Sequence, residues 1–383
     1  MPQAIRIILL SFIFAVPLGC KDKYVSPYAP PRTGYLVVEG YIAGNGPTTF
    51  TLTRTIPLPG DSALPHELNA KVKVEGSDNS VYSLSEAGNG VYSADTLPLN
   101  KDFTYRLHIN TANGREYTSD FISFTQTPAI DSISWTSSAS GLDIYANTHD
   151  PANATHYYQW QYDDAWEYHT AQYASYKYKG DTTPVSVVPR DSSEQIYKCW
   201  GSSSSQNIIV ESTVKLAQDV VYSHPLKHIP PNDVQTGVLY SILVHQYALT
   251  QDAFNFLTLM QKNTESLGSI FDVQPSSVRG NIHCITNPSE PVIGFVSAGT
   301  VQQQRIFIKS IDIPSYYNPI CPSPDTVVTF GMLRHFYEDL DFIPVSKYFN
   351  GAGNFAGWLS APADCADCRL QGGKTQKPSF WPN

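Results

Sequence analysis

The chain has 383 residues, of which 15% are charged, and a formal net charge of −9 at pH 7. Its length suits about two to three domains and is enough to bury a sizeable core. Aromatic residues make up 12% of the chain and include 24 tyrosines, a balance typical of a β-rich exported protein. Because binding to phosphates needs basic patches, the acidic balance argues against a nucleic-acid partner.

The chain opens with an export signal. Arg6 is the only charge before an apolar stretch over residues 7–16, which is too short to span a bilayer as a helix. The stretch closes on Gly19-Cys20, although Pro17 stands where lipoprotein signals usually have leucine. We therefore predict a lipoprotein signal peptide over residues 1–19, cleaved before Cys20, which then receives diacylglycerol and fatty-acyl chains such as palmitate. The alternatives are an exported protein without lipid and an unprocessed cysteine.

Residues 20–34 are polar and proline-rich, and we predict a short extended tether there. Asp22, beside the lipidation site, favours the cell-surface face of the outer membrane, whereas Lys21 and Lys23 leave the periplasmic face open. No later stretch is apolar for long enough to cross a bilayer, so we expect attachment through the lipid alone.

Residues 35–127 alternate between apolar and polar positions, with turn residues between the runs. About seven strands in a segment of this length predict an immunoglobulin-like β-sandwich. The predicted strands are 36–42, 50–54, 72–74, 81–84, 91–93, 103–109 and 117–124.

A second, fibronectin-like β domain is predicted over residues 128–310, after a boundary at Thr127-Pro128. It contains one helix, near residues 250–266, with Thr250 as N-cap. A single amphipathic helix between strands is expected to pack on a sheet. We predict that residues 311–383 form an irregular extension packed on this domain. In the predicted helix near residues 250–266, apolar residues lie three, four and seven positions after Ala253, at Phe256, Leu257 and Met260.

An aromatic run in the second domain is a candidate ligand site. Tyr158, Trp160 and Tyr162 share one face of a predicted strand. On an exposed strand, this ladder of rings would stack on a sugar or a peptide, but half-buried aromatic strands are also ordinary sheet material. Both interpretations stay open at this point.

Besides Cys20, the chain has five cysteines: Cys199, Cys284, Cys321, Cys365 and Cys368. An exported compartment permits disulfides, and an odd number leaves at least one thiol unpaired or paired outside the chain. The spacing of the last two cysteines also suits half a zinc site or a redox pair. We favour structural disulfides that hold the C-terminal extension, since closing loops of tens of residues contributes ~3 to 4 kcal/mol.

The sequence contains none of the common catalytic or nucleotide-binding motifs, such as G-x-S-x-G, H-E-x-x-H, a Walker loop or a Rossmann fingerprint. We therefore expect no cofactor, no catalytic residue and no resident metal. The carboxylate pairs of glycosidases leave no readable spacing, so a surface hydrolase stays as a less favoured alternative.

Three groups of short motifs resemble one family. The opening strand contains Leu36-Val37-Val38-Glu39-Gly40. The central motifs are Asn263-Thr264-Glu265, Gly268-Ser269-Ile270-Phe271-Asp272, Gln274-Pro275, Gly280-Asn281-Ile282, Asn287-Pro288 and Gly294-Phe295. The C-terminal motifs are Cys365-Ala366-Asp367-Cys368-Arg369, Gly372-Gly373 and Lys377-Pro378-Ser379-Phe380-Trp381. Together they resemble the Bacteroidota lipoproteins known as domain of unknown function 4249, over nearly the whole mature chain.

The resemblance implies an outer-membrane lipoprotein whose partner is a TonB-dependent receptor. It implies no catalytic residues. We therefore expect a non-enzymatic accessory or ligand-capturing subunit of an uptake system, with a glycan or a peptide as ligand. The alternative, from another class of protein, is a cell-surface adhesion or structural module.

Overall fold

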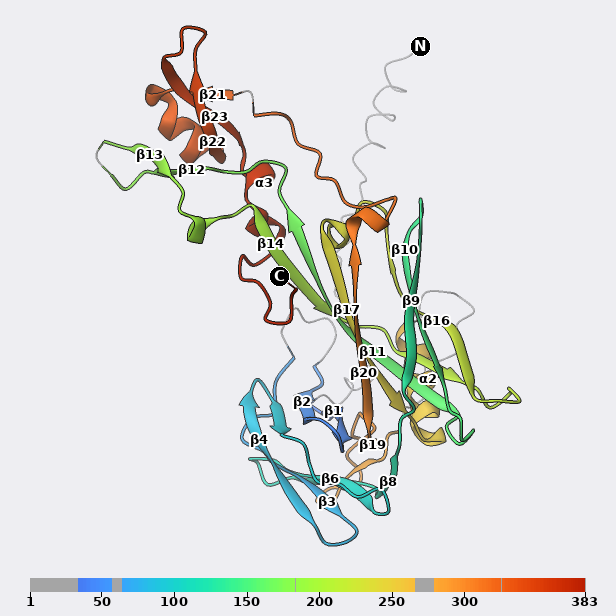
Figure 1. The fold of residues 1–383 in the computed structure, drawn as a ribbon. Coiled ribbons are helices and arrows are strands. Elements are labelled where there is room, and N and C mark those ends of the chain that lie inside the picture. Colours follow the sequence, from blue (N-terminus) through green and yellow to red (C-terminus); the bar gives the residue numbers. More distant parts are fainter. Residues whose placement is uncertain (1–33, 57–63, 183, 266–278, 325, 383) are drawn as a thin grey trace, which may run out of the picture.

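The structure is a computed structural model and describes residues 34–56, 64–182, 184–265, 279–324 and 326–382. The predicted signal peptide, the lipidation site Cys20 and the tether up to residue 33 lie outside these residues. The described residues are mostly β, as predicted, and form three parts in a row: a barrel, a sandwich and a small lobe (Figure 1). None of the helices in these ranges is both long and apolar enough to cross a membrane.

The barrel is built mainly from the first described third of the chain. Its strands are β1 (Leu36–Ala43), β2 (Thr48–Arg54), β3 (Lys71–Gly76), β4 (Val81–Gly88), β5 (Val91–Ala94), β6 (Thr104–Asn110), β8 (Ile122–Thr125) and β19 (Ala298–Gly299). They pair in the order β6-β3-β4-β5-β2-β1-β19-β8, and β8 also pairs with β6, so this sheet closes on itself. Two short strands, β7 (Glu116–Ser119) and β18 (Ile282–Cys284), extend the sheet beside β6.

Six of the seven predicted strands of this part are confirmed, and the seventh, 117–124, is divided into β7 and β8. The predicted immunoglobulin-like sandwich is corrected to a closed barrel. The barrel closes through β19, where Ala298 pairs with Ile42 on one side and with Phe124 on the other. Both pairings are parallel and join segments far apart in the sequence. Periodicity within residues 35–127 contains no information about a strand that arrives from residues 298–299.

The sandwich consists of two sheets around a shared core. One sheet has the order β16-β10-β9, and the other has the order β14-β11-β17-β20 with β15 also paired to β11. Inward side chains of both sheets, among them Ile144, Trp160 and Ile242, are fully buried. The strands are β9 (Ile130–Ser138), β10 (Gly141–His149), β11 (Tyr157–His169), β14 (Lys198–Ser204), β15 (Ile209–Ser212), β16 (Val220–Ile229), β17 (Leu239–Ala248) and β20 (Val301–Lys309).

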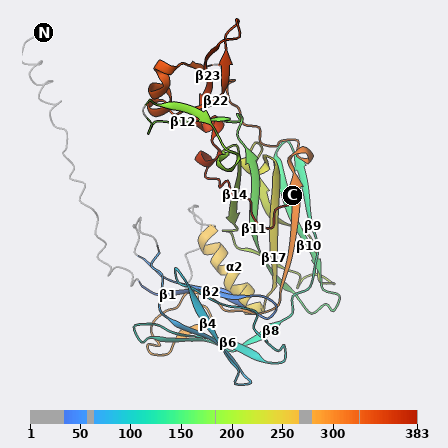
Figure 2. The ribbon, with the colours of Figure 1, turned by 60° about the vertical axis from the view of Figure 1, so that its left-hand side comes forward.

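One helix, α2 (Gln251–Glu265), follows β17. The Thr250 side chain accepts a hydrogen bond from the backbone N–H of Ala253 at 3.2 Å, so the predicted N-cap is confirmed. Figure 2 shows α2 between the barrel and the five-stranded sheet.

The small lobe combines two segments distant in sequence. A hairpin, β12 (Tyr176–Lys179) and β13 (Ser186–Pro189), packs beside a sheet of order β21-β23-β22. Val328, Leu333 and Trp358 form a buried core against the hairpin, so residues 311–383 are less irregular than we predicted. The remaining elements are β21 (Thr326–Val328), β22 (Phe342–Phe349), β23 (Phe355–Pro362) and α3 (Ala363–Ala366).

The barrel and the sandwich are joined by hydrogen bonds as well as by the chain. The Asn45 side chain bonds to both the N–H and the C=O of Val301, each at 2.8 Å. Thr127 Oγ1 donates to the carbonyl of Thr300 at 2.5 Å and accepts from the N–H of Ala248 at 2.9 Å. These bonds fix the two parts relative to one another beside the cleft described below.

Candidate functional site: a cleft between barrel and sandwich

A cleft of about 990 Å³ lies between the barrel, the sandwich and α2. The outer face of the five-stranded sheet forms its base, which we call the amide floor. One side is formed by α2, and another by β1, the turn that follows it and residues 293–295, of which Ile293 is hydrogen-bonded to the backbone of β1. The volume falls within the range of about 300–1,000 Å³ that is usual for ligand sites.

The amide floor consists of cross-strand neighbours on three successive strands of the sheet, β11, β17 and the edge strand β20. Gln159 and Gln161 on β11 lie opposite Tyr247 and His245 on β17, and His245 in turn lies opposite Gln303 on β20. All five residues line the cleft. Because side chains alternate along a strand, the residues between them point into the sandwich core.

Hydrogen bonds hold most of the amide floor in place. The Tyr247 hydroxyl donates to Gln161 Oε1 at 3.1 Å. Gln303 Nε2 donates to His245 Nδ1 at 3.0 Å, which leaves His245 Nε2–H to donate to Asp163 Oδ2 at 2.9 Å. The orientation of these side chains is therefore set before any ligand arrives.

The pKa values of two groups, Asp163 and Tyr247, are shifted by their surroundings at the amide floor. The hydrogen bond from His245 lowers the pKa of Asp163, and burial opposes that change. Burial, with the charge of Asp163 as a second cause, raises the pKa of Tyr247 to about 12. At neutral pH, Asp163 is therefore an anion and Tyr247 keeps its hydroxyl proton.

The side walls are apolar and aromatic. The predicted apolar face of α2, with Phe256, Leu257 and Met260, lines the cleft instead of packing wholly on a sheet. Phe256 lies 5.4 Å from Phe295 between ring centroids. On the barrel side, the ring of Tyr41 lies 4.9 Å from that of Tyr247 and is tilted by 60°.

The lining offers little acid–base chemistry. Glu39 is its one carboxylate among the described residues, whereas glycoside hydrolysis generally uses two carboxyl groups about 5 to 9.5 Å apart. Both ring nitrogens of His245 are already engaged. Within the described part of the chain, no three His, Cys, Asp or Glu side chains come close enough together to hold a metal ion.

The predicted aromatic ladder does not line the cleft. Tyr158 and Trp160 are fully buried in the sandwich core, and Tyr162 is partly buried and packs against that core. The Trp160 ring stacks between Tyr158, at 5.7 Å, and His224, at 4.7 Å. This corrects the ligand-stacking prediction, because the strand turns its aromatic face inward and the opposite face outward.

The functional candidates that sequence reasoning missed are Gln159 and Gln161. They alternate with the tyrosines and tryptophan of the same strand, so an inward aromatic face requires an outward amide face. The alternation of glutamine with aromatic residues along this strand could therefore have identified Gln159 and Gln161 from the sequence.

The cysteines form the expected structural disulfides. Cys199 pairs with Cys368, and Cys321 pairs with Cys365. Cys284 is a buried free thiol in the barrel core. Cys365 and Cys368 are thus bonded to different distant partners, and neither belongs to a zinc site or to a redox pair of the two.

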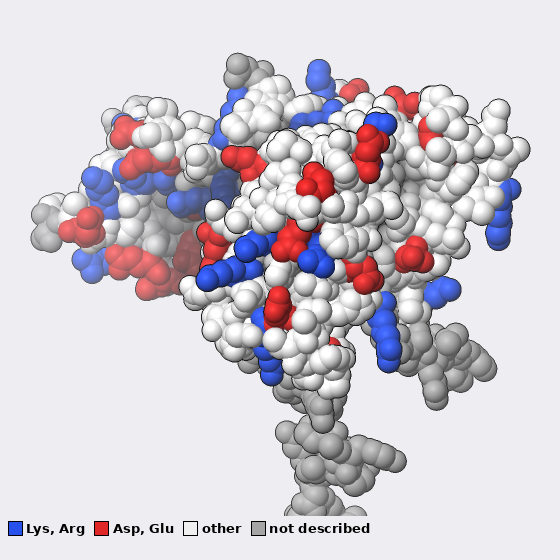
Figure 3. Space-filling view, turned by 90° about the horizontal axis from the view of Figure 1, so that it is seen from below, with Lys and Arg blue, Asp and Glu red and all other residues white. Residues whose placement is uncertain are grey.

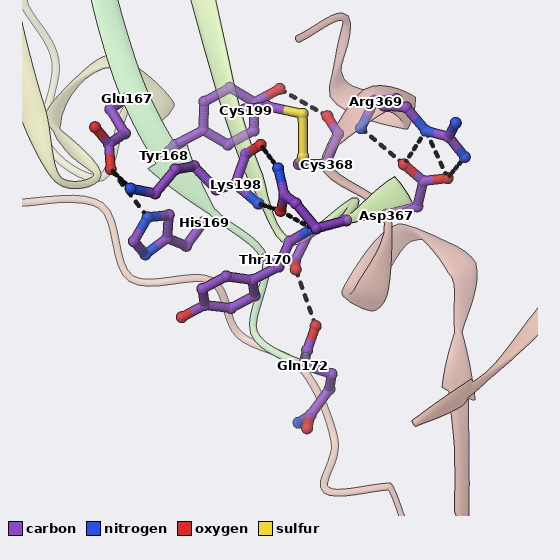
Figure 4. Close-up of a disulfide and its surroundings, with 12 residues drawn as sticks. Glu167, Tyr168, His169, Thr170, Gln172, Lys198, Cys199, Asp367, Cys368 and Arg369 are labelled. Carbon is purple, nitrogen blue, oxygen red and sulfur yellow. Dashed lines mark hydrogen bonds and ion pairs between the residues drawn. A yellow bond between two sulfur atoms is a disulfide. The ribbon is translucent and has the colours of Figure 1, made fainter. Parts of the chain in front are cut away.

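Figure 4 shows the surroundings of the first disulfide. The Tyr168 hydroxyl donates to the carbonyl of Cys368 at 2.7 Å, and Asp367 forms a two-oxygen pair with Arg369. This disulfide ties the C-terminal segment to β14 of the sandwich, as we predicted for a structural bridge.

These features define the class of protein: a β-rich protein of several sheets, stapled by two disulfides, with a preformed cleft between its first two parts. The family model described as "Domain of unknown function (DUF4249)" matches residues 22–305, and the chain belongs to this family. The predicted family is therefore confirmed.

No curated protein matches the chain. Among solved structures, it is similar to chitinase ChiA74 from Bacillus thuringiensis, with 13% sequence identity and a TM-score of 0.15. The match covers 48% of this chain and 30% of the chitinase. A TM-score this low says nothing about the fold or the activity of this chain.

Proposed function

We propose that this protein is a non-enzymatic, ligand-capturing subunit of a TonB-dependent uptake system, and that it captures its ligand in the cleft between barrel and sandwich. It is a Bacteroidota lipoprotein in this proposal, attached to the outer membrane through lipid on Cys20. The observation that supports capture most directly is the preordered amide floor beneath an apolar wall.

Binding without turnover is supported by the chemistry of the lining. Glu39 has no second carboxylate beside it in the described lining, and His245 has no free ring nitrogen with which to act as a base. The cleft is thus equipped to hold a ligand by shape and hydrogen bonds.

We also infer that the sandwich is the predicted fibronectin-like domain. Its first, second and sixth strands (β9, β10 and β16) form one sheet, and the other five (β11, β14, β15, β17 and β20) form the other. Immunoglobulin-like and fibronectin-like sandwiches divide their strands between two sheets in a comparable way.

The surface fits a protein partner better than nucleic acid. On the face shown in Figure 3, acidic and basic side chains are interspersed, and no broad basic patch is visible there. Nucleic-acid binding requires such a patch, whereas a protein partner does not.

The uptake role is tested by purifying the full-length lipoprotein from its own membrane in mild detergent. A tag joined through a linker after the exposed Pro382 leaves the buried Trp381 in place. We expect a TonB-dependent receptor to co-purify in roughly stoichiometric amount, as identified by mass spectrometry. If the lipoprotein is recovered alone while other outer-membrane complexes survive the same extraction, the uptake role is wrong and an adhesion or structural role replaces it.

A further inference from the structure

We propose that the cleft binds a neutral oligosaccharide, with the apolar faces of its rings against α2 and its hydroxyls on the amide floor. This inference rests on the proposed capturing function and names the chemical class of the ligand. Four observations support it.

The first observation is the absence of ionic partners. Glu39 is the only Asp, Glu, Lys or Arg side chain in the described lining of the cleft. Both ring nitrogens of His245 already form hydrogen bonds within the sheet, to Gln303 and to Asp163. An acidic ligand would lose its hydration here without gaining an opposite charge. A basic ligand would meet only the exposed carboxylate of Glu39, so an uncharged ligand is favoured.

The second observation is the match between amides and hydroxyls. A sugar hydroxyl both donates and accepts hydrogen bonds, and a side-chain amide offers one group of each kind. The described residues give the Gln159 amide no hydrogen-bond partner, and they leave the Gln161 NH₂ and the Gln303 carbonyl oxygen free for a ligand. Two strands of the floor, β11 and β20, thus present unused donors and acceptors on either side of β17.

The third observation is the aromatic wall opposite this floor. Sugar rings have an apolar C–H face that packs on aromatic and aliphatic side chains. Tyr41 and Phe295 supply rings on the barrel side and Phe256 supplies one on α2 beside Leu257, while the ring of Tyr247 lies on the floor itself. A ligand with one apolar face and one hydroxyl-rich edge satisfies both surfaces at once.

The fourth observation distinguishes a sugar from an extended peptide. Peptides are commonly bound along a free sheet edge, which pairs with their main-chain groups. The cleft presents the face of the sheet, and both β11 and β17 are paired on each side. Recognition must therefore come from side chains, which suits hydroxyls better than a peptide backbone.

The test is native affinity electrophoresis of the full-length lipoprotein in detergent, through gels that contain one polysaccharide each. The neutral probes are starch, β-glucan, xylan and mannan, and the acidic probes are polygalacturonate and alginate. Isothermal titration with hexasaccharides of the retarding polymer, and with uncharged hexapeptides, then gives the affinities. The variants are Tyr247→Ala and Gln161→Ala in the cleft, with Tyr222→Ala as the matched control, because Tyr222 is 85% exposed on β16 and outside the cleft.

We expect at least one neutral polysaccharide to retard the protein. We also expect Tyr247→Ala to weaken hexasaccharide binding about ten-fold or more and Gln161→Ala to weaken it several-fold, with Tyr222→Ala unchanged. The inference is overturned if no neutral sugar binds, or if one binds equally well to wild type and to both cleft variants. If an acidic sugar or a peptide binds instead and Tyr247→Ala abolishes that binding, the ligand class is wrong while capture in the cleft stands.

Discussion

The indole N–H of Trp381 donates a hydrogen bond to Glu167 Oε2 at 2.9 Å and so ties the C-terminal segment to β11. Glu167 is also bonded by His169 at 3.1 Å and by Lys198 at 3.0 Å, and its side chain is only 9% exposed. Burial alone would raise the pKa of this carboxyl group. The three hydrogen bonds outweigh burial and lower the pKa of Glu167 to about 2.

This shift predicts an acid-dependent loss of stability. A carboxyl group whose pKa is lower in the folded chain than its ordinary 4.5 stabilises the fold above that pH and loses the effect as the pH falls to about 2. The contribution is about 3 kcal/mol at neutral pH. Wild type should therefore exceed Glu167→Gln in free energy of unfolding at pH 7, and the difference should shrink between about pH 5 and pH 2.

Denaturant titration at several pH values measures this difference. Asp181→Asn is the matched control, since Asp181 is exposed and has no ion pair among the described residues. Trp381→Phe removes one of the three hydrogen-bond donors to Glu167 and should raise the pKa of that carboxyl group. In this background, the stability difference made by Glu167→Gln should therefore begin to shrink at a higher pH. A difference between wild type and Glu167→Gln that stays constant from pH 7 to pH 2 would contradict the argument.

A second prediction separates the two faces of β11. Trp160 is fully buried and donates from its indole to Gln246 at 2.9 Å, whereas its neighbour Gln161 is exposed in the cleft. Trp160→Ala should lower the free energy of unfolding by about 3 to 5 kcal/mol, because it leaves a cavity in the sandwich core. Gln161→Ala should change it by less than about 0.5 kcal/mol. Equal stabilities of the two variants in urea titration would contradict this assignment, and a larger loss for Gln161→Ala would show that the faces are assigned the wrong way round.

This face assignment also shows how far the sequence could predict the site. The period-two pattern at Tyr158, Trp160 and Tyr162 predicts the strand, but it does not say which face meets the core. That choice depends on whether another sheet covers the face, and here β10 and β16 supply the covering residues Ile144 and Leu226. Local alternation could not reveal it.

The closed barrel and the cleft could not be predicted from the local sequence pattern, for a related reason. Strands β1 to β8 and the helix α2 could be predicted from runs of residues. Closure by β19, however, depends on parallel pairing over more than 170 positions, as between Phe124 and Ala298. The lining of the cleft likewise comes from β1 and from the sandwich sheet and α2, which lie far from β1 in the sequence.

A third prediction concerns the disulfides. Cys199 and Cys368 are 169 positions apart, and Cys321 and Cys365 are 44 positions apart. In the chain-entropy account, a bridge restricts the unfolded chain more when its loop is longer, so each bridge contributes about 4 to 5 kcal/mol and the first contributes more. Cys199→Ala/Cys368→Ala should therefore destabilise more than Cys321→Ala/Cys365→Ala.

Guanidinium titration of the two double variants tests this order. Cys284→Ala is the control for the loss of a buried sulfur without the loss of a bridge, and it should cost about 1 kcal/mol. Limited proteolysis should also release the C-terminal segment first from Cys199→Ala/Cys368→Ala, because that bridge joins it to β14. The reverse order of stabilities would mean that native contacts, and not loop length, decide what each bridge contributes.

The last prediction concerns a buried ion pair in the sandwich. The side chain of Asp164 is completely buried and is paired with Lys227, whose side chain is 11% exposed. Ser203 and Tyr240 also donate to this carboxylate, and Gln235 accepts from Lys227. Lys227→Met leaves the carboxylate without its counter-charge and should lower the free energy of unfolding by about 3 to 5 kcal/mol.

A double-mutant cycle shows whether the loss of stability in Lys227→Met comes from the lost ion pair or from the unpaired charge that is left on Asp164. Asp164→Asn combined with Lys227→Met removes both charges and nearly preserves the shape of the side chains. Because breaking a buried pair costs more than replacing it, the double variant should be more stable than Lys227→Met alone by at least about 1 kcal/mol. Additive losses in urea titration would mean that the two charges do not interact and that the hydrogen bonds from Ser203 and Tyr240 alone hold Asp164.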